Sequence, residues 1–108
     1  MPHALASSNL KKWRPKRRTG VQCRLVEGEM VVLDRKHDLI HQFNKTATFI
    51  WEHCDGQHSA AEIADAVCEN FEIEEATAIK EVIETLEKLQ YLELTGDDQA
   101  DDKPEKEN

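Results

Sequence analysis

The residues best suited to chemistry in this sequence are His53, Cys54 and His58, which lie within six positions of one another. A zinc site would normally bring closely spaced ligand pairs such as Cys-x-x-Cys, and the sequence contains no such pair. Cys54 also falls on the apolar face of a predicted helix, which favours a buried thiol over a ligand or a nucleophile. We therefore predict no catalytic centre, no metal site and no cofactor, and we retain a zinc- or thiol-dependent enzyme as an alternative.

The elements that would position these residues begin with strands. Apolar and polar residues alternate over residues 21–25 and again over residues 39–43, which is typical of strands with one buried face. The apolar run at residues 30–33 predicts a central strand between them. Gly28 permits a tight turn before that run, and the polar residues 34–38 form a second turn after it. We expect a three-stranded antiparallel meander in which residues 39–43 form an edge.

Helical spacing replaces strand alternation after Asn44, whose side chain suits a helix N-cap. Ser59 and Glu62 have the spacing of a capping box that opens a second helix, and a third helix begins near Glu74. The apolar face of the first helix is formed by Ala47, Ile50, Trp51 and Cys54, and that of the third by Ile79, Val82, Ile83, Leu86 and Leu89. The order of three strands followed by three helices predicts an α+β fold with two layers around one core.

The two ends of the chain differ from its centre in composition and in charge. Residues 1–20 carry six lysines and arginines and no acid, whereas residues 97–108 carry six acids and two lysines. Neither end has a hydrophobic period, and such compositions cannot bury enough apolar area to offset the entropy lost on ordering. We predict a disordered basic arm at residues 1–20, a folded domain at residues 21–95 and a disordered acidic tail at residues 96–108.

The composition also bears on the compartment in which the protein works. No apolar run approaches the roughly 20 residues that a membrane span needs, and the N-terminus lacks the apolar core of a signal peptide. The chain has three cysteines at wide spacing, an odd number that does not suit a disulfide framework. We therefore expect reduced thiols, a cytoplasmic protein and no membrane partner.

A further alternative is a winged-helix protein that binds DNA or acts in transcription. The basic residues 11–18 could contact a phosphate backbone, and the second and third helices are arranged in sequence like a helix-turn-helix. The third helix, however, has more glutamates than lysines: Glu74, Glu75, Glu81, Glu84 and Glu87 against Lys80 and Lys88. A recognition helix of that charge would be repelled by DNA, so we expect no nucleic-acid partner.

Four runs of residues, at 31–34, 40–44, 50–56 and 62–64, together resemble the pattern of the PqqD family over residues 21–95. The resemblance implies a winged-helix-like fold and a peptide chaperone without catalytic activity, also called a RiPP recognition element. Such domains hold the leader of a ribosomal precursor peptide, for pyrroloquinoline quinone (PQQ) or another product. They present it to a modifying enzyme, often a radical S-adenosylmethionine (SAM) protein.

The resemblance also implies where the leader binds, as a strand beside the third strand and in a groove against the third helix. Transferred to this sequence, the peptide-binding residues are Leu39, Ile40, His41, Gln42 and Phe43 on the strand and Ile79, Val82, Ile83 and Leu86 on the helix. Asn44, Trp51 and Gly56 match the family pattern as structural residues that cap, anchor and end the first helix. Because the third helix is acidic, we expect the peptide to carry positive charge.

Overall fold

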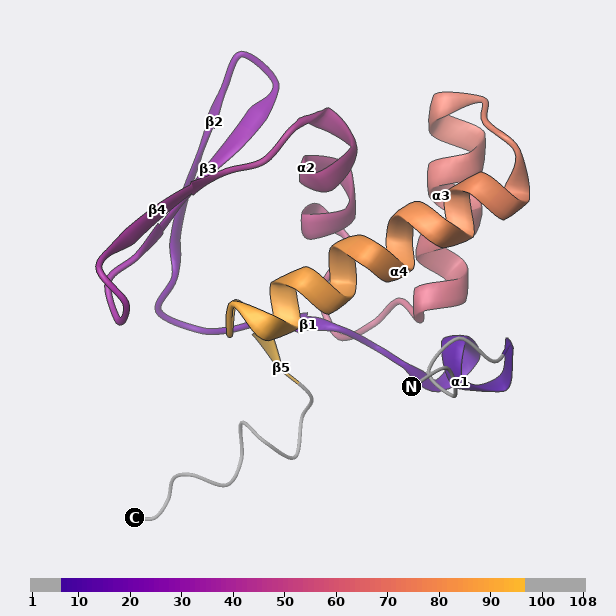
Figure 1. Ribbon diagram of the computed structural model, residues 1–108, viewed down its shortest axis with the longest axis horizontal. Coiled ribbons are helices and arrows are strands. Elements are labelled where there is room, and N and C mark those ends of the chain that lie inside the picture. Colours follow the sequence, from indigo (N-terminus) through magenta and orange to yellow (C-terminus); the bar gives the residue numbers. More distant parts are fainter. Residues whose placement is uncertain (1–6, 97–108) are drawn as a thin grey trace.

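The structure of this chain, a computed structural model, describes residues 7–96 (Figure 1). Its elements in chain order are α1 (Ser7–Lys12), β1 (Lys16–Arg17), β2 (Gln22–Val26), β3 (Glu29–Asp34), β4 (Leu39–Gln42), α2 (Lys45–Glu52), α3 (Ala60–Phe71), α4 (Glu75–Tyr91) and β5 (Thr95–Gly96). The predicted order of three strands followed by three helices is confirmed by β2–β4 and α2–α4, and the fold is α+β. Helix α1 and the short strands β1 and β5 were not predicted.

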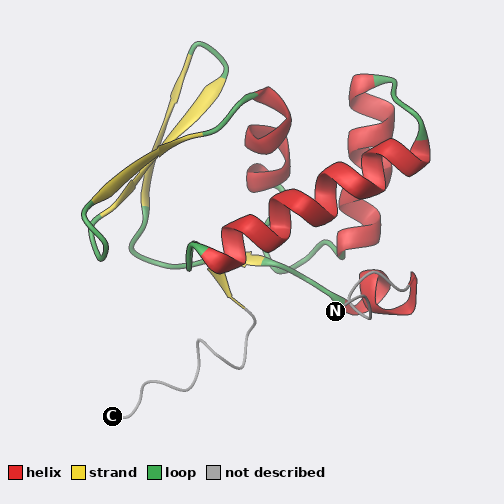
Figure 2. Cartoon of the chain, viewed as in Figure 1, coloured by secondary structure: helices red, strands yellow, loops and turns green. Residues whose placement is uncertain are grey.

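The strands β2, β3 and β4 form an antiparallel sheet with β3 in the centre, to one side of the helices in Figure 2. Burial alternates along β3, where Met30, Val32 and Asp34 are buried. Glu27 and Gly28 form the turn between β2 and β3 with φ of 53° and 84°, the left-handed values that such hairpin turns require. Strand β4 pairs with β3 alone among the strands of residues 7–96, so its other side is an edge.

The helices carry the predicted caps and the predicted apolar faces. The Asn44 Oδ1 atom accepts a hydrogen bond from the Ala47 N–H at 2.8 Å, and a capping box begins α3. Trp51 is 1% exposed, and its ring meets that of Phe43 edge to face with 5.5 Å between the centroids. The buried residues that α4 adds to this core are Ala78, Val82, Ile83, Leu86 and Leu89. One hydrophobic core therefore joins the sheet to the three helices.

Residues 7–20 are folded against the domain, so the predicted disorder is wrong for this part of the arm. Leu10 is 6% exposed and belongs to the hydrophobic core. Strand β1 pairs with β5, which includes Gly96 from the predicted tail. The other residues predicted to be disordered, 1–6 and 97–108, lie outside the described residues.

Backbone hydrogen bonds to a distant loop hold the arm in place. The Ala60 N–H donates to the Trp13 carbonyl at 2.7 Å, and the Gly56 N–H donates to the Pro15 carbonyl at 2.9 Å. Gly56 has a φ of 79°, and a Cβ atom there would lie 3.3 Å from the Lys16 side chain. This glycine follows the end of α2 and accommodates the arm rather than ending the helix. Contacts between residues so far apart leave no periodic signal in a sequence.

Three arginines of the arm bind backbone carbonyls of their own chain, and one of them is Arg18, whose Nε donates to the Glu93 carbonyl at 2.7 Å. Arg17 Nη1 donates to the carbonyls of Trp51 at 2.8 Å and Glu52 at 3.2 Å, at the C-terminus of α2. A cation is favourable there because the last carbonyls of a helix lack helical partners and the helix dipole is negative at this end. Arg14 Nη1 donates to the Gln57 carbonyl at 2.7 Å. Part of the arm's positive charge therefore takes part in hydrogen bonds with the domain.

Candidate functional site

A groove of about 440 Å³ lies between strand β4, the start of α2 and helix α4. Its lining residues are Ile40, His41, Gln42, Phe43, Asn44, Thr46, Ala47, Glu81, Thr85, Lys88, Leu89 and Leu92. Four of the five strand residues predicted to bind a peptide are among them, and the fifth, Leu39, is exposed at the start of β4. The groove therefore runs along the free edge of the sheet, with a helix as its second wall.

The backbone of β4 directs two of its residues outward from the sheet. In an antiparallel ladder, successive residues alternate between pointing their N–H and C=O groups at the partner strand and pointing them away. The Phe43 N–H donates to the Met30 carbonyl at 2.9 Å, which fixes the phase of this alternation along β4. Ile40 and Gln42 therefore direct their N–H and C=O groups away from β3. Four backbone groups are placed to pair with an additional strand.

The helix residues predicted to bind the peptide lie on a different face of α4. All four belong to the hydrophobic core or pack against it: Ile79, Val82, Ile83 and Leu86. The helical wall of the groove is formed instead by Glu81, Thr85, Lys88, Leu89 and Leu92. Leu89 belongs both to this row and to the apolar stripe, whereas Glu81, Thr85 and Lys88 each lie one position before a stripe residue. Only helical spacing therefore marks the row in the sequence. Contact between a peptide and any residue of α4 stays a prediction.

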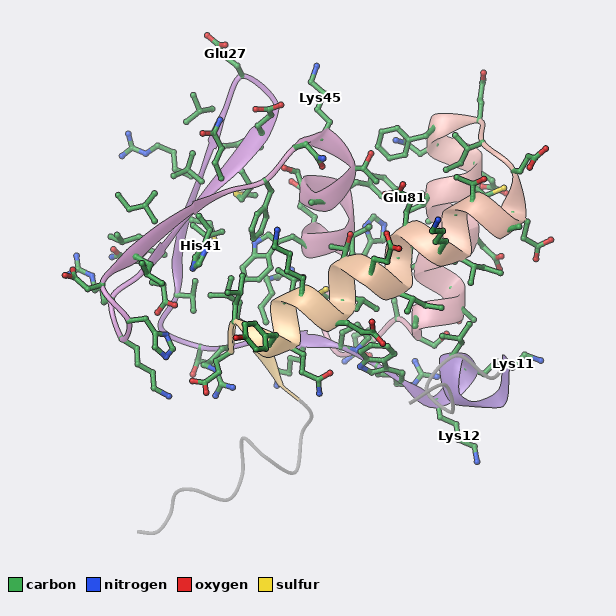
Figure 3. All side chains as sticks on the ribbon, viewed as in Figure 1. Lys11, Lys12, Glu27, His41, Lys45 and Glu81 are labelled. Atoms are coloured by element: carbon green, nitrogen blue, oxygen red, sulfur yellow. The ribbon has the colours of Figure 1, made fainter. Side chains whose placement is uncertain are left out.

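A buried carboxylate lies next to the groove residue His41. The side chain of Asp34 is 6% exposed, and its Oδ2 atom is 2.8 Å from His37 Nδ1 and 3.6 Å from His41 Nε2. The hydrogen bond from His37 lowers the pKa of Asp34 below its usual value. The longer distance exceeds that of a hydrogen bond, and His41 Nε2 is buried without a hydrogen-bond partner among residues 7–96. Figure 3 shows His41 between the sheet and the helices.

Ion pairs join the β3–β4 turn to the residues that follow α4. The Glu93 Oε1 atom is 3.2 Å from His37 Nε2 and 3.3 Å from Lys36 Nζ. The hydrogen bond from Lys36 lowers the pKa of Glu93. Because both ring nitrogens of His37 face carboxylates, the ring donates to both only when it carries two protons. These contacts hold the start of β4 close to the end of α4 and so fix one end of the groove.

The residues of the alternative thiol or zinc site are occupied by other contacts. Cys54 Sγ donates to the Ile50 carbonyl at 3.2 Å, and burial raises the pKa of this thiol to about 12. His53 Nδ1 lies 2.8 Å from the Phe49 carbonyl, and His58 Nδ1 lies 3.0 Å from Asp55 Oδ1. Within residues 7–96, no group of three or more His, Cys, Asp or Glu side chains is placed to hold a metal ion. The geometry therefore argues against a thiolate nucleophile paired with either histidine.

The fold and the groove together define a small α+β domain with an unpaired sheet edge beside a helix. The sequence matches the PqqD family, described as coenzyme PQQ synthesis protein D, over residues 29–94. The chain belongs to this family, and the resemblance seen in the sequence is confirmed. A search of the curated proteins finds no significant match.

Two solved structures are similar to this chain. One is TbiB1 in complex with the TbiA(beta) leader peptide, which is 21% identical with a TM-score of 0.68, over 74% of this chain and 93% of that chain. The other is a lasso peptide synthetase B1 complexed with the leader peptide, which is 22% identical with a TM-score of 0.68, over 77% of this chain and 98% of that chain. At this level of identity the likeness establishes the fold. None of the helices in residues 7–96 has the length and apolar character to cross a membrane.

Proposed function

We propose that this chain is a non-catalytic peptide-binding domain that captures the leader of a ribosomal precursor peptide by strand addition to β4. The observation that carries the proposal is the placement of the outward-facing backbone of Ile40 and Gln42 beside a helix-walled groove. An extended peptide gains main-chain hydrogen bonds from such an edge and seats alternate side chains in the groove. Both similar structures are complexes with leader peptides, which supports the same class of ligand here.

The strength of binding depends on the side chains as well as on the edge. The four outward backbone groups would each contribute about 1 kcal/mol net, whereas micromolar affinity needs about 8 kcal/mol. Apolar contacts must supply the rest, and Ile40, 70% exposed, together with the half-buried Leu92, offers apolar surface to a ligand. A sheet edge without a helix beside it would offer the peptide backbone hydrogen bonds but no comparable apolar contribution to the binding free energy.

The residues predicted from the sequence have two roles in this proposal. The strand residues Leu39, Ile40, His41, Gln42 and Phe43 form the docking edge. Ile79, Val82, Ile83 and Leu86 fix α4 to the core, which supports their proposed role in peptide binding through the rigidity of the wall rather than through its surface. Direct contact is assigned to the row of α4 that lines the groove.

The modifying chemistry belongs to a separate enzyme in this proposal. The one buried thiol near a histidine, Cys54, has a raised pKa and an internal partner, which suits a domain that presents a substrate. A radical SAM protein is the partner class that the PqqD family membership favours. The free thiols at Cys23, Cys54 and Cys68 are consistent with work in the cytoplasm.

The proposal is tested by titrating the isotopically labelled protein with a synthetic leader peptide taken from any short precursor reading frame found beside its gene. Backbone amide shifts should concentrate at residues 39–43 and on the groove row of α4. Shifts confined to residues 7–20 of the arm, with β4 unperturbed, would contradict strand addition. Absence of binding at millimolar leader would contradict the proposed ligand.

A further inference from the structure

The helical wall of the groove carries two opposite charges, Glu81 and Lys88, that have no ion-pair partner among residues 7–96. Both side chains are exposed. They are separated by seven positions, which is about 10.5 Å along a helix axis. Figure 3 shows Glu81 about midway along α4. The other glutamates of α4 do not line the groove, so the general acidity of the helix is not what a bound peptide would meet.

The two charges lie toward different ends of the groove. Glu93, just after α4, contacts Lys36 in the turn before β4, so the end of α4 lies beside the start of β4. Strand β4 and helix α4 therefore run in opposite directions, as Figure 1 shows. Glu81 then lies toward the end of β4, and Lys88 lies nearer its start. The nearest lysine of α2, Lys45, is directed to the β2–β3 hairpin, where its Cε atom would meet a Cβ added to Gly28 at 3.5 Å.

We infer that Glu81 and Lys88 select the sequence and fix the register of the bound peptide, an inference that rests on the proposed strand addition at β4. A peptide that pairs antiparallel to β4 runs in the same direction as α4, and antiparallel pairs are the commoner arrangement. Such a peptide places a basic side chain opposite Glu81 and an acidic side chain opposite Lys88. At about 3.3 Å per strand residue, 10.5 Å corresponds to roughly three positions. Because strand side chains alternate, the acidic residue follows the basic one by two or four positions.

The partner class is thus a peptide with a basic residue followed closely by an acidic one, rather than a peptide of net positive charge. Opposite charges at two fixed points also oppose a shift in register, because a slipped peptide brings like charges together or leaves both unpaired. Apolar residues between and beyond them would contact Leu92. In this arrangement the apolar contacts supply most of the affinity, and the two charges supply the selectivity.

The test compares charge reversals inside the groove with matched reversals outside it. Glu81→Lys and Lys88→Glu should each raise the Kd for the synthetic leader roughly three- to tenfold at low salt. The controls Glu84→Lys and Lys80→Glu make the same changes in net charge on exposed positions of α4 outside the groove, and they should alter Kd less than twofold. A leader whose basic and acidic residues are exchanged should bind the double variant, Glu81→Lys with Lys88→Glu, more tightly than it binds the unaltered protein.

The possible failures of this experiment are distinct. If the leader binds β4 but groove and control variants behave alike, the charge selection is wrong and strand addition stands. If the exchanged leader prefers the unaltered protein, the assignment of the two charges is wrong. If no leader binds the unaltered protein, both this inference and the proposed function are wrong. Circular dichroism of each variant confirms that the fold is retained.

Discussion

Within residues 7–96, the two outer strands of the sheet, β2 and β4, each have one edge that pairs with no other strand, yet their surroundings differ. All five residues of β2 are exposed, and the hollow of about 580 Å³ beside it is lined only by residues of β2 and β3 and by Ile40 of β4, with no helix as a wall. The groove of about 440 Å³ along β4 is smaller, but α4 forms its second wall. An edge offers hydrogen bonds to any extended chain, whereas pockets for alternate side chains give specificity. A neighbouring helix, rather than the open edge or the size of the hollow, therefore distinguishes β4 as the proposed binding site.

The largest expected effect is on the free energy of unfolding, and it compares a core residue that contacts the end of β4 with an exposed residue of β2. Trp51→Ala should lower the free energy of unfolding by about 3–5 kcal/mol, because Trp51 is 1% exposed and contacts Phe43 at the end of β4. Leu25→Ala on β2, where the side chain is 55% exposed, should change it by about 0.5 kcal/mol or less. Urea unfolding followed by circular dichroism measures both. Near-native stability of the tryptophan variant would show that the face of α2 is assigned wrongly.

A proline on each edge tests which strand binds the peptide. Gln42→Pro removes an outward N–H of β4 without removing a ladder hydrogen bond, so leader binding should weaken at least about tenfold while the fold persists. In the register of β2 and β3, the hairpin pair Val26 and Glu29 is hydrogen-bonded, so Leu25 faces outward on the opposite edge. Leu25→Pro is therefore the matched control and should bind the leader normally. Calorimetric titration measures the Kd of each variant for the leader. An equal loss of affinity in both variants would contradict the assignment of the peptide to β4 rather than to β2.

The carboxylate of Asp34, next to β4, gives a pH-dependent effect of intermediate size. The pKa of Asp34 is lowered by the hydrogen bond from His37, so its stabilisation is complete above the unfolded-state value of about 3.9 and is lost as the pH falls through the lower folded-state value. Asp34→Asn should reduce stability at pH 7 and flatten its decline below about pH 4. Glu27→Gln at the tip of the β2–β3 hairpin (Figure 3) should leave the curve unchanged. An unaltered acid limb in the Asp34 variant would contradict this role.

The smallest expected effect is the absence of a change at β2. Cys23 is an exposed thiol on that strand, and its rate of labelling by Ellman's reagent should stay within about twofold when the leader is bound. Cys54, whose pKa is raised to about 12 by burial, should remain unlabelled until the protein unfolds and serves as an internal control. Mass mapping identifies the labelled cysteine. Protection of Cys23 by the leader would place the peptide at β2 and would contradict binding at β4.

The elements around the groove were predictable because their signals are local. Alternation over residues 39–43, the cap at Asn44 and the capping box at Ser59 each depend on neighbouring residues, and the structure contains the strand, the cap and the capping box. The apolar stripe of α4 was also identified, but its assignment to the groove did not follow, because a stripe shows that a face is buried and not what covers it. Helices α2 and α3 cover it in this fold.

Two features could not be derived from local patterns. The arm is held by contacts such as Arg17 with the carbonyl of Trp51, between residues 34 positions apart, and its composition alone resembles a disordered segment. The groove row that contains Thr85 and Lys88 has mixed polarity, so it does not differ in sequence from an ordinary solvated helix face. Only the position of β4 beside α4 brings these residues into the same groove.

The most direct test of strand addition to β4 is amide hydrogen exchange measured residue by residue with and without the leader. The amides of Ile40 and Gln42 should exchange rapidly in the free protein and become protected when the leader is bound, because the added strand would accept their hydrogen bonds. The amides of Cys23 and Leu25 on β2 should exchange at the same rate in both states. Protection at Cys23 and Leu25, or unchanged exchange at Ile40 and Gln42 in a saturated complex, would contradict strand addition at β4.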